Sequence, residues 1–204
     1  QSKNGLSNKI SVITGGAGTG KTTIIKEIIR IARKSKVDVV LCAPTGKAAM
    51  RIKEACNHSA STIHRVNPCP YKIEDYQNEL YGKSSINKED TFDELDMITD
   101  SIVVIDEWSM VGIHLAARAF LTFKDASSII FVGDPNQLAS IEPGKLLKDM
   151  VDCQKIPTTK LVECYRNEGS IIENASKIND GQTFSSLIFD NQFDFIESEK
   201  SDCC

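Results

Sequence analysis

Four short runs of apolar, mostly β-branched residues stand out along the chain, at positions 10–14, 37–43, 102–105 and 129–132. Within these runs the apolar residues follow one another and do not alternate regularly with polar ones. Runs of this kind and length are typical of strands that are buried on both faces of a sheet. The pattern therefore predicts four strands of a parallel sheet.

Segments with a helical period separate these runs. Residues 46–55 and 111–123 are two of them, and residues 21–34 are the clearest. The apolar face of that clearest segment consists of Ile24, Ile25, Ile28, Ile29 and Ala32. Strands that alternate with helices indicate an α/β fold, in which a doubly wound parallel sheet carries helices on both faces.

The remaining segments are less regular. Residues 67–100 are polar and contain two prolines and a glycine, so we expect an insertion or a long loop there. Further along, the pattern predicts a short helix at 145–151, a strand at 160–163 and a helix at 170–179. After residue 180 the pattern weakens.

The composition is that of an ordinary soluble globular protein, with 41% hydrophobic and 25% charged residues among 204. The net charge of −4 argues against a broadly basic surface, so any contact with DNA must come from a local patch. Seven cysteines without a framework spacing favour reduced thiols and a cytoplasmic location. No apolar stretch approaches the roughly 20 residues of a membrane span, and we expect no membrane partner.

The first apolar run leads directly into a glycine-rich loop. The segment Gly15-Gly16-Ala17-Gly18-Thr19-Gly20-Lys21-Thr22 fits the P-loop pattern, in which backbone N–H groups surround the phosphates of a nucleotide. Glycines allow the positive φ angles that such a turn needs, and the following helix adds the positive end of its dipole. We therefore expect this segment and Thr23 to bind ATP, with Lys21 at the β- and γ-phosphates and the Thr22 hydroxyl at Mg²⁺.

Two acidic residues end the third apolar run. An aspartate at the carboxyl end of a buried strand beside a P-loop, here Asp106, is placed to hold Mg²⁺. An acidic neighbour, here Glu107, can orient and deprotonate the attacking water. Taken alone, the pair could simply end a strand, but together with the P-loop it indicates ATP hydrolysis.

Polar residues also follow the other two predicted strands. Pro44-Thr45-Gly46-Lys47 comes after the second strand, and Gly133-Asp134-Pro135-Asn136-Gln137 comes after the fourth. In an open α/β sheet, ligands bind at the carboxyl ends of the strands. All four strands are therefore expected to bring their polar residues to one edge.

In order and spacing, six segments resemble the superfamily 1 DNA helicases of the RecD/TraA family, which includes the α subunit of exodeoxyribonuclease V. They are TGGAGTGKTT at 14–23, APTGKAA at 43–49, STIHR at 61–65, VIDEWSMV at 104–111, GDPNQL at 133–138 and YRN at 165–167. The resemblance extends from residue 10 to about residue 179. It implies a RecA-like P-loop NTPase domain, the first ATPase domain of a helicase.

The resemblance also implies roles for single residues. Gln137 would sense the γ-phosphate and link it to DNA, and Arg166 would contact the γ-phosphate from a second RecA-like domain. The path of single-stranded DNA would be lined by Pro44, Thr45, Lys47, Thr62, His64 and Arg65. Three of these residues have plainer alternatives: a solvated amide for Gln137, a surface arginine for Arg166 and a buried histidine for His64.

Two departures from the family pattern affect the interpretation. Trp108 stands where a small residue is usual, and it could stack on a base or pack in the core. Later helicase motifs are missing, so we expect residues 1–155 to form the first domain and residues 156–204 to begin a truncated second one. The chain is then a fragment, expected to be monomeric and poorly active.

The resemblance implies Mg-ATP hydrolysis that drives translocation on single-stranded DNA and duplex unwinding, in DNA repair and recombination. Other subunits of a helicase–nuclease complex are candidate partners. The alternative is a P-loop ATPase that uses ATP as a switch and binds DNA or a protein partner without moving along DNA.

Overall fold

The computed structural model describes residues 8–66, 98–138, 140–163, 170–191 and 193–194. The chain forms two compact units, which divide between Val162 and Glu163. None of the helices in the described ranges combines the length and the hydrophobicity that a membrane span requires.

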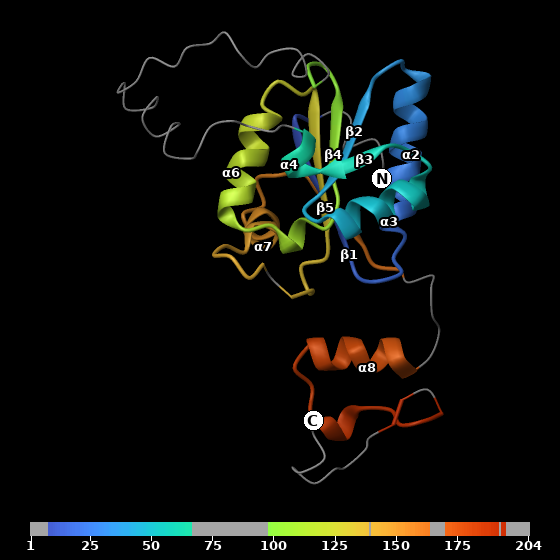
Figure 1. The fold of residues 1–204 in the computed structure, drawn as a ribbon. Coiled ribbons are helices and arrows are strands. Elements are labelled where there is room, and N and C mark those ends of the chain that lie inside the picture. The colour runs from blue at the N-terminus through green and yellow to red at the C-terminus, as the bar shows by residue number, and fades with distance from the viewer. Residues whose placement is uncertain (1–7, 67–97, 139, 164–169, 192, 195–204) are drawn as a thin grey trace. The chain divides into compact units, whose positions relative to one another are not determined.

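The first unit is built on a parallel sheet, which among the described residues has six strands in the order β3-β2-β4-β5-β1-β6 (Figure 1). The strands are β1 (Ile10–Gly15), β2 (Val39–Ala43), β3 (Ala60–Thr62), β4 (Ile102–Ile105), β5 (Ser128–Gly133) and β6 (Thr158–Leu161). Every neighbouring pair is parallel. All carboxyl ends therefore lie at one edge, and the expected α/β fold is confirmed.

Helices cover both faces of this sheet (Figure 1). They are α2 (Lys21–Lys34), α3 (Gly46–Cys56), α4 (Ile63–Val66), α6 (Ile113–Thr122) and α7 (Leu146–Asp152), with a 3₁₀ turn η2 (Trp108–Met110) after β4. Residues of α2 and α3 pack on one face, whereas residues of α4, α6 and α7 pack on the other.

Strand β4 illustrates why the apolar runs are continuous. Ile102 and Val104 belong to the core that α2 and α3 cover, whereas Val103 and Ile105 belong to the core on the opposite face. All four side chains are buried. Burying each stabilises the fold by about 1.5–3 kcal/mol, which exceeds or matches the roughly 1–2 kcal/mol needed to fix each backbone residue.

The structure corrects the expected boundary at residue 155. Strand β6 begins at Thr158 and pairs with β1, from Val12 opposite Thr158 to Gly15 opposite Leu161. Residues 156–162 therefore belong to the first unit, because their backbone completes its sheet. Strand β3 was not predicted, since its three residues Ala60-Ser61-Thr62 form no apolar run.

The second unit contains helix α8 (Ser170–Asn179), as expected, and a 3₁₀ turn η3 (Phe184–Ser186). The buried Asn174 holds the segment that follows, because its Oδ1 accepts from the Ile188 N–H at 2.7 Å. Ser170 Oγ also donates to Asp190 Oδ1 at 2.7 Å. Arg166 and the expected insertion up to residue 97 lie outside the described residues.

Candidate nucleotide and nucleic-acid site

The glycine-rich loop follows β1 and leads into α2, as predicted. Gly18 and Gly20 have φ angles of 77° and 85°, in the left-handed region that glycine adopts without strain. Inside the loop, Thr19 Oγ1 donates to the Gly16 carbonyl at 2.9 Å. The loop thus has the turn conformation that a phosphate cradle requires.

Lys21 lies against this loop. Its Nζ donates to the carbonyl oxygens of Gly15 at 2.7 Å and Gly16 at 2.9 Å. The first turn of α2 has no acidic residue, and Gly20 at its N-cap offers no side-chain acceptor. The backbone N–H groups of this turn and the helix dipole therefore remain suited to an anion such as phosphate.

Asp106 is the first residue after β4, and its backbone N–H donates to the Cys42 carbonyl at 2.9 Å. Burial raises the pKa of its carboxyl from 3.8 to about 6, and the negative charge of Glu107 adds to this. A hydrogen bond from the Glu107 backbone and the positive charge of Lys21 act in the opposite direction. Lys21 and Asp106 are therefore near enough for their charges to interact across the site.

Glu107 has an unusual backbone conformation for a residue with a side chain, with φ 55° and ψ 39°. Its Oε2 is buried and has no hydrogen-bond partner within the part of the chain that the structure describes. A buried carboxylate oxygen without a donor is costly, and it calls for an explanation such as a catalytic role or a bound water or ion. The unpartnered oxygen makes Glu107 a candidate functional residue.

The site offers the oxygen donors that Mg²⁺ prefers. Thr22 in the first turn of α2 and Asp106 after β4 are both half-buried. In the described ranges, no three His, Cys, Asp or Glu side chains are grouped closely enough to hold a metal by themselves. Mg²⁺ typically takes one or two protein oxygens and completes its shell with phosphate oxygens and water. The residues present fit a magnesium ion that arrives with a nucleotide.

The loop after β5 brings Gln137 to the same edge. Asp134 is buried, and its Oδ1 accepts from the Asn136 N–H at 3.0 Å. Its backbone carbonyl accepts from the Gln137 N–H at 3.2 Å, and the Gln137 side chain is exposed. Asp134 thus shapes the turn that presents Gln137. Its role was not predicted, although Asp-Pro-Asn is a turn signal.

The candidate DNA-binding residues lie at the ends of β2 and β3. Ala43 is paired with Thr62, so the segments that begin at Pro44 and Ile63 leave neighbouring strands. Thr45 Oγ1 accepts from the Ala48 N–H at 3.2 Å and caps α3, so this hydroxyl has a structural role that was not predicted.

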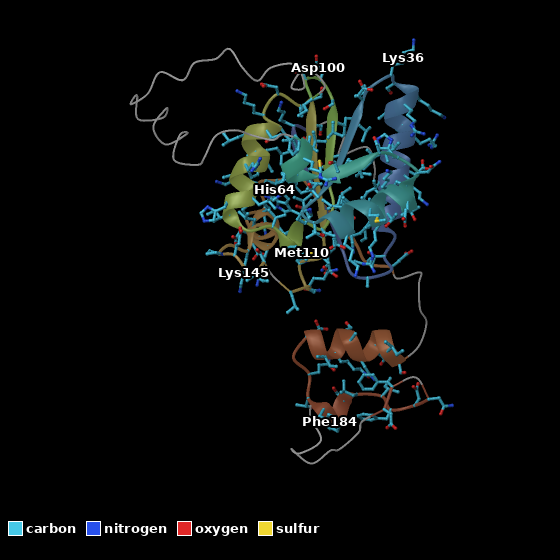
Figure 2. All side chains as sticks on the ribbon, viewed as in Figure 1. Lys36, His64, Asp100, Met110, Lys145 and Phe184 are labelled. Carbon is cyan, nitrogen blue, oxygen red and sulfur yellow. The ribbon has the colours of Figure 1, made fainter. Side chains whose placement is uncertain are left out.

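Side chains on the two helices after these strands complete the set. His64 is exposed on α4 (Figure 2), which excludes the buried histidine of the alternative interpretation. Lys47 on α3 and Arg65 on α4 are exposed as well, and neither has an ion pair with another described residue. Pro44 and Thr62 are half-buried.

Trp108 packs in the core, as the plainer of its two interpretations predicted. It is fully buried, and its ring centroid lies 4.3 Å from that of Phe131 on β5. A fully buried ring in this position cannot stack on a base.

Comparisons with known proteins agree with these features. The profile of the family described as AAA domain matches residues 4–201. The ATP-dependent RecD2 DNA helicase of Deinococcus radiodurans is 31% identical over 177 residues, covering 86% of this chain and 22% of that protein. The RecBCD enzyme subunit RecD of Mycobacterium tuberculosis is 29% identical over 228 residues, covering 95% of this chain and 36% of that subunit.

A solved structure shares the fold. The crystal structure of Pif1 helicase from Candida albicans matches with a TM-score of 0.62 at 24% identity, over 89% of this chain and 43% of that one. The similarity to RecD helicases that the motifs predicted is confirmed. The chain spans between a fifth and two fifths of the length of the two RecD-type relatives named above.

Proposed function

Because the chain belongs to the AAA-domain family, we propose that it binds and hydrolyses Mg-ATP as the first motor domain of a RecD-like DNA helicase. The observation that carries this proposal is that Lys21 lies close enough to Asp106 for their charges to interact, at the carboxyl edge of one parallel sheet, with Glu107 as the next residue. A cation for phosphate, a carboxylate for a metal and a second carboxylate for water are the groups that hydrolysis needs.

In this proposal, each residue acts on a different part of the nucleotide. Backbone N–H groups of residues 15–23 and the Lys21 ammonium bind the β- and γ-phosphates. The Thr22 hydroxyl and the Asp106 carboxylate hold Mg²⁺. Once bound, Mg²⁺ neutralises charge that develops on the phosphate oxygens.

Glu107 acts as the general base in this proposal. Its unpartnered Oε2 supports the assignment, because no described residue donates to it and a general base must be free to accept a proton. Gln137, exposed at the same edge, would contact that water or the γ-phosphate. Arg166 would stabilise the charge of the transferring phosphoryl group from a second RecA-like domain.

Single-stranded DNA would cross the ends of β2 and β3. Pro44, Thr62 and the exposed His64 line this part of the edge, and Lys47 and Arg65 supply positive charge. Contacts of this kind follow the phosphate backbone and do not read bases. The similarity to a RecBCD subunit makes other subunits of a helicase–nuclease complex candidate partners in the cytoplasm.

Two variants of the full-length protein test the proposal. Glu107→Gln should keep Mg-ATP affinity but lower DNA-stimulated turnover by about 10²–10⁴-fold, because the general base is lost. Lys21→Ala should instead lose most of the affinity. Calorimetry and steady-state hydrolysis separate the two effects. Wild-type turnover by Glu107→Gln would place the base elsewhere, and hydrolysis without movement along DNA would favour an ATPase switch.

A further inference from the structure

Trp108, the single tryptophan of the chain, directly follows Glu107 and is fully buried. Its ring centroid lies 4.3 Å from that of Phe131 on β5, with the planes tilted by 44°. Phe120 on α6 presents its ring nearly at right angles, at 6.2 Å and 83°. The indole therefore packs against a ring on the sheet and against a ring on a helix.

The backbone on both sides of Glu107 is hydrogen-bonded. On one side, the backbone of Asp106 is tied to β2 by its hydrogen bond to the Cys42 carbonyl. On the other side, the Met110 N–H donates to the Glu107 carbonyl and the Val111 N–H donates to the Trp108 carbonyl, both at 3.1 Å. Figure 2 shows Met110 near the lower end of the sheet, away from Lys36 and Asp100.

The left-handed conformation of Glu107 needs an external cause. A residue with a Cβ adopts φ near 55° only at a cost in free energy, so the surrounding structure must impose it. No side-chain hydrogen bond caps η2 at Glu107. The residue that follows Glu107 is the buried Trp108, at the position where the chain departs from the helicase pattern.

We propose that Trp108 is a positioning residue for ATP hydrolysis. By anchoring η2 between Phe131 and Phe120, it keeps Glu107 in the conformation that directs the carboxylate into the site. This inference rests on the proposed function, in which Glu107 is the base. It assigns Trp108 no contact with the nucleotide.

The test compares two Trp108 variants with a core control in the full-length protein. Trp108→Ala should lower kcat by about 10²-fold, because a small misplacement of a catalytic group has that effect. KM and the dissociation constant for Mg-ATP should change by less than about threefold, since ground-state binding is retained. Trp108→Phe keeps a ring at this position and should recover most of the rate. Phe123→Leu changes a buried aromatic of the same core, at the residue that follows α6, and should leave kcat within about threefold of wild type.

A second measurement does not depend on hydrolysis. Amide hydrogen exchange of Met110 and Val111 should accelerate at least about tenfold in Trp108→Ala, while α2 amides keep their protection. Equal kcat values for Trp108→Ala and Phe123→Leu, or unchanged exchange at η2, would overturn the inference. An inactive wild-type protein would refute the proposed function, and the exchange result would still decide whether Trp108 holds the turn.

Discussion

Asp106→Asn is expected to stabilise the ligand-free protein at neutral pH. Burial raises the pKa of this carboxyl from 3.8 to about 6, a difference of about 2 units. Each unit corresponds to about 1.36 kcal/mol, so holding the ionised form in this site costs up to about 3 kcal/mol. Because the side chain is only half-buried, we expect a gain of about 1–3 kcal/mol on removing the charge.

The pH dependence follows from the sign of this shift. A carboxyl whose pKa is raised by folding contributes stability that is fully present below about pH 4 and is lost as the pH rises through about 6. Asparagine does not titrate. The stabilisation by Asp106→Asn should therefore be close to zero near pH 4 and reach its full value above about pH 6.

Urea denaturation of wild type and variant across this pH range measures the difference. Asp125→Asn is a matched control, since Asp125 is exposed on the loop between α6 and β5. The same Asp106→Asn variant should lose Mg²⁺-dependent ATP affinity. This loss would show that the buried carboxylate, which costs stability, is needed for function. A variant that is less stable than wild type at neutral pH, or a difference that does not change with pH, would refute the reasoning.

Three further predictions concern other parts of the structure. Gly15→Ala should destabilise the protein by about 1–3 kcal/mol and weaken ATP binding, because the new Cβ would lie 2.4 Å from Thr19 Oγ1. Gly46→Ala, with open space around the new Cβ, is the control in thermal denaturation and calorimetry. Equal melting temperatures for the two variants would contradict the prediction. Single-stranded DNA affinity should fall steeply with salt, and Arg65→Ala should reduce the slope by about 0.7, the value for one phosphate contact. Binding that does not change with salt would exclude contacts to the phosphate backbone at this edge. Asn174→Ala should lower the protection of α8 amides by about 1–3 kcal/mol in hydrogen exchange, while the protection of β4 amides stays unchanged. Unaltered α8 protection would show that the hydrogen bond between Asn174 and Ile188 does not stabilise this unit.

The sheet could largely be predicted because burial on both faces leaves a visible signal. The run at 102–105 matches β4 residue for residue, and the helix at 21–34 matches α2. The strands that were missed or shifted carry no such signal. Strands β3 and β6 lie at the two edges of the sheet and are short and partly polar, so the backbone pairs without a continuous apolar run.

The site was predictable to the extent that topology determines it. Parallel strands end at one edge, and this alone brings Lys21, Asp106 and Gln137 together. Local conformation was not accessible from residue types. The left-handed backbone of Glu107 depends on the packing around η2, and the cap formed by Thr45 depends on where α3 begins.

The Gly15 and Gly16 carbonyls accept hydrogen bonds from the Lys21 ammonium, so they compete with the nucleotide phosphates for this group. The ammonium group has three N–H donors, so one remains for a phosphate while both carbonyl bonds persist, and a phosphate that engages more of them displaces a carbonyl. The affinity for nucleotide therefore includes an exchange of hydrogen-bond partners. Lys21→Ala also leaves both carbonyls without their donor, which frees the loop before any ligand arrives. The affinity lost in that variant therefore combines an exchange of partners with a change in loop order, and it should not be taken as the strength of one lysine–phosphate contact.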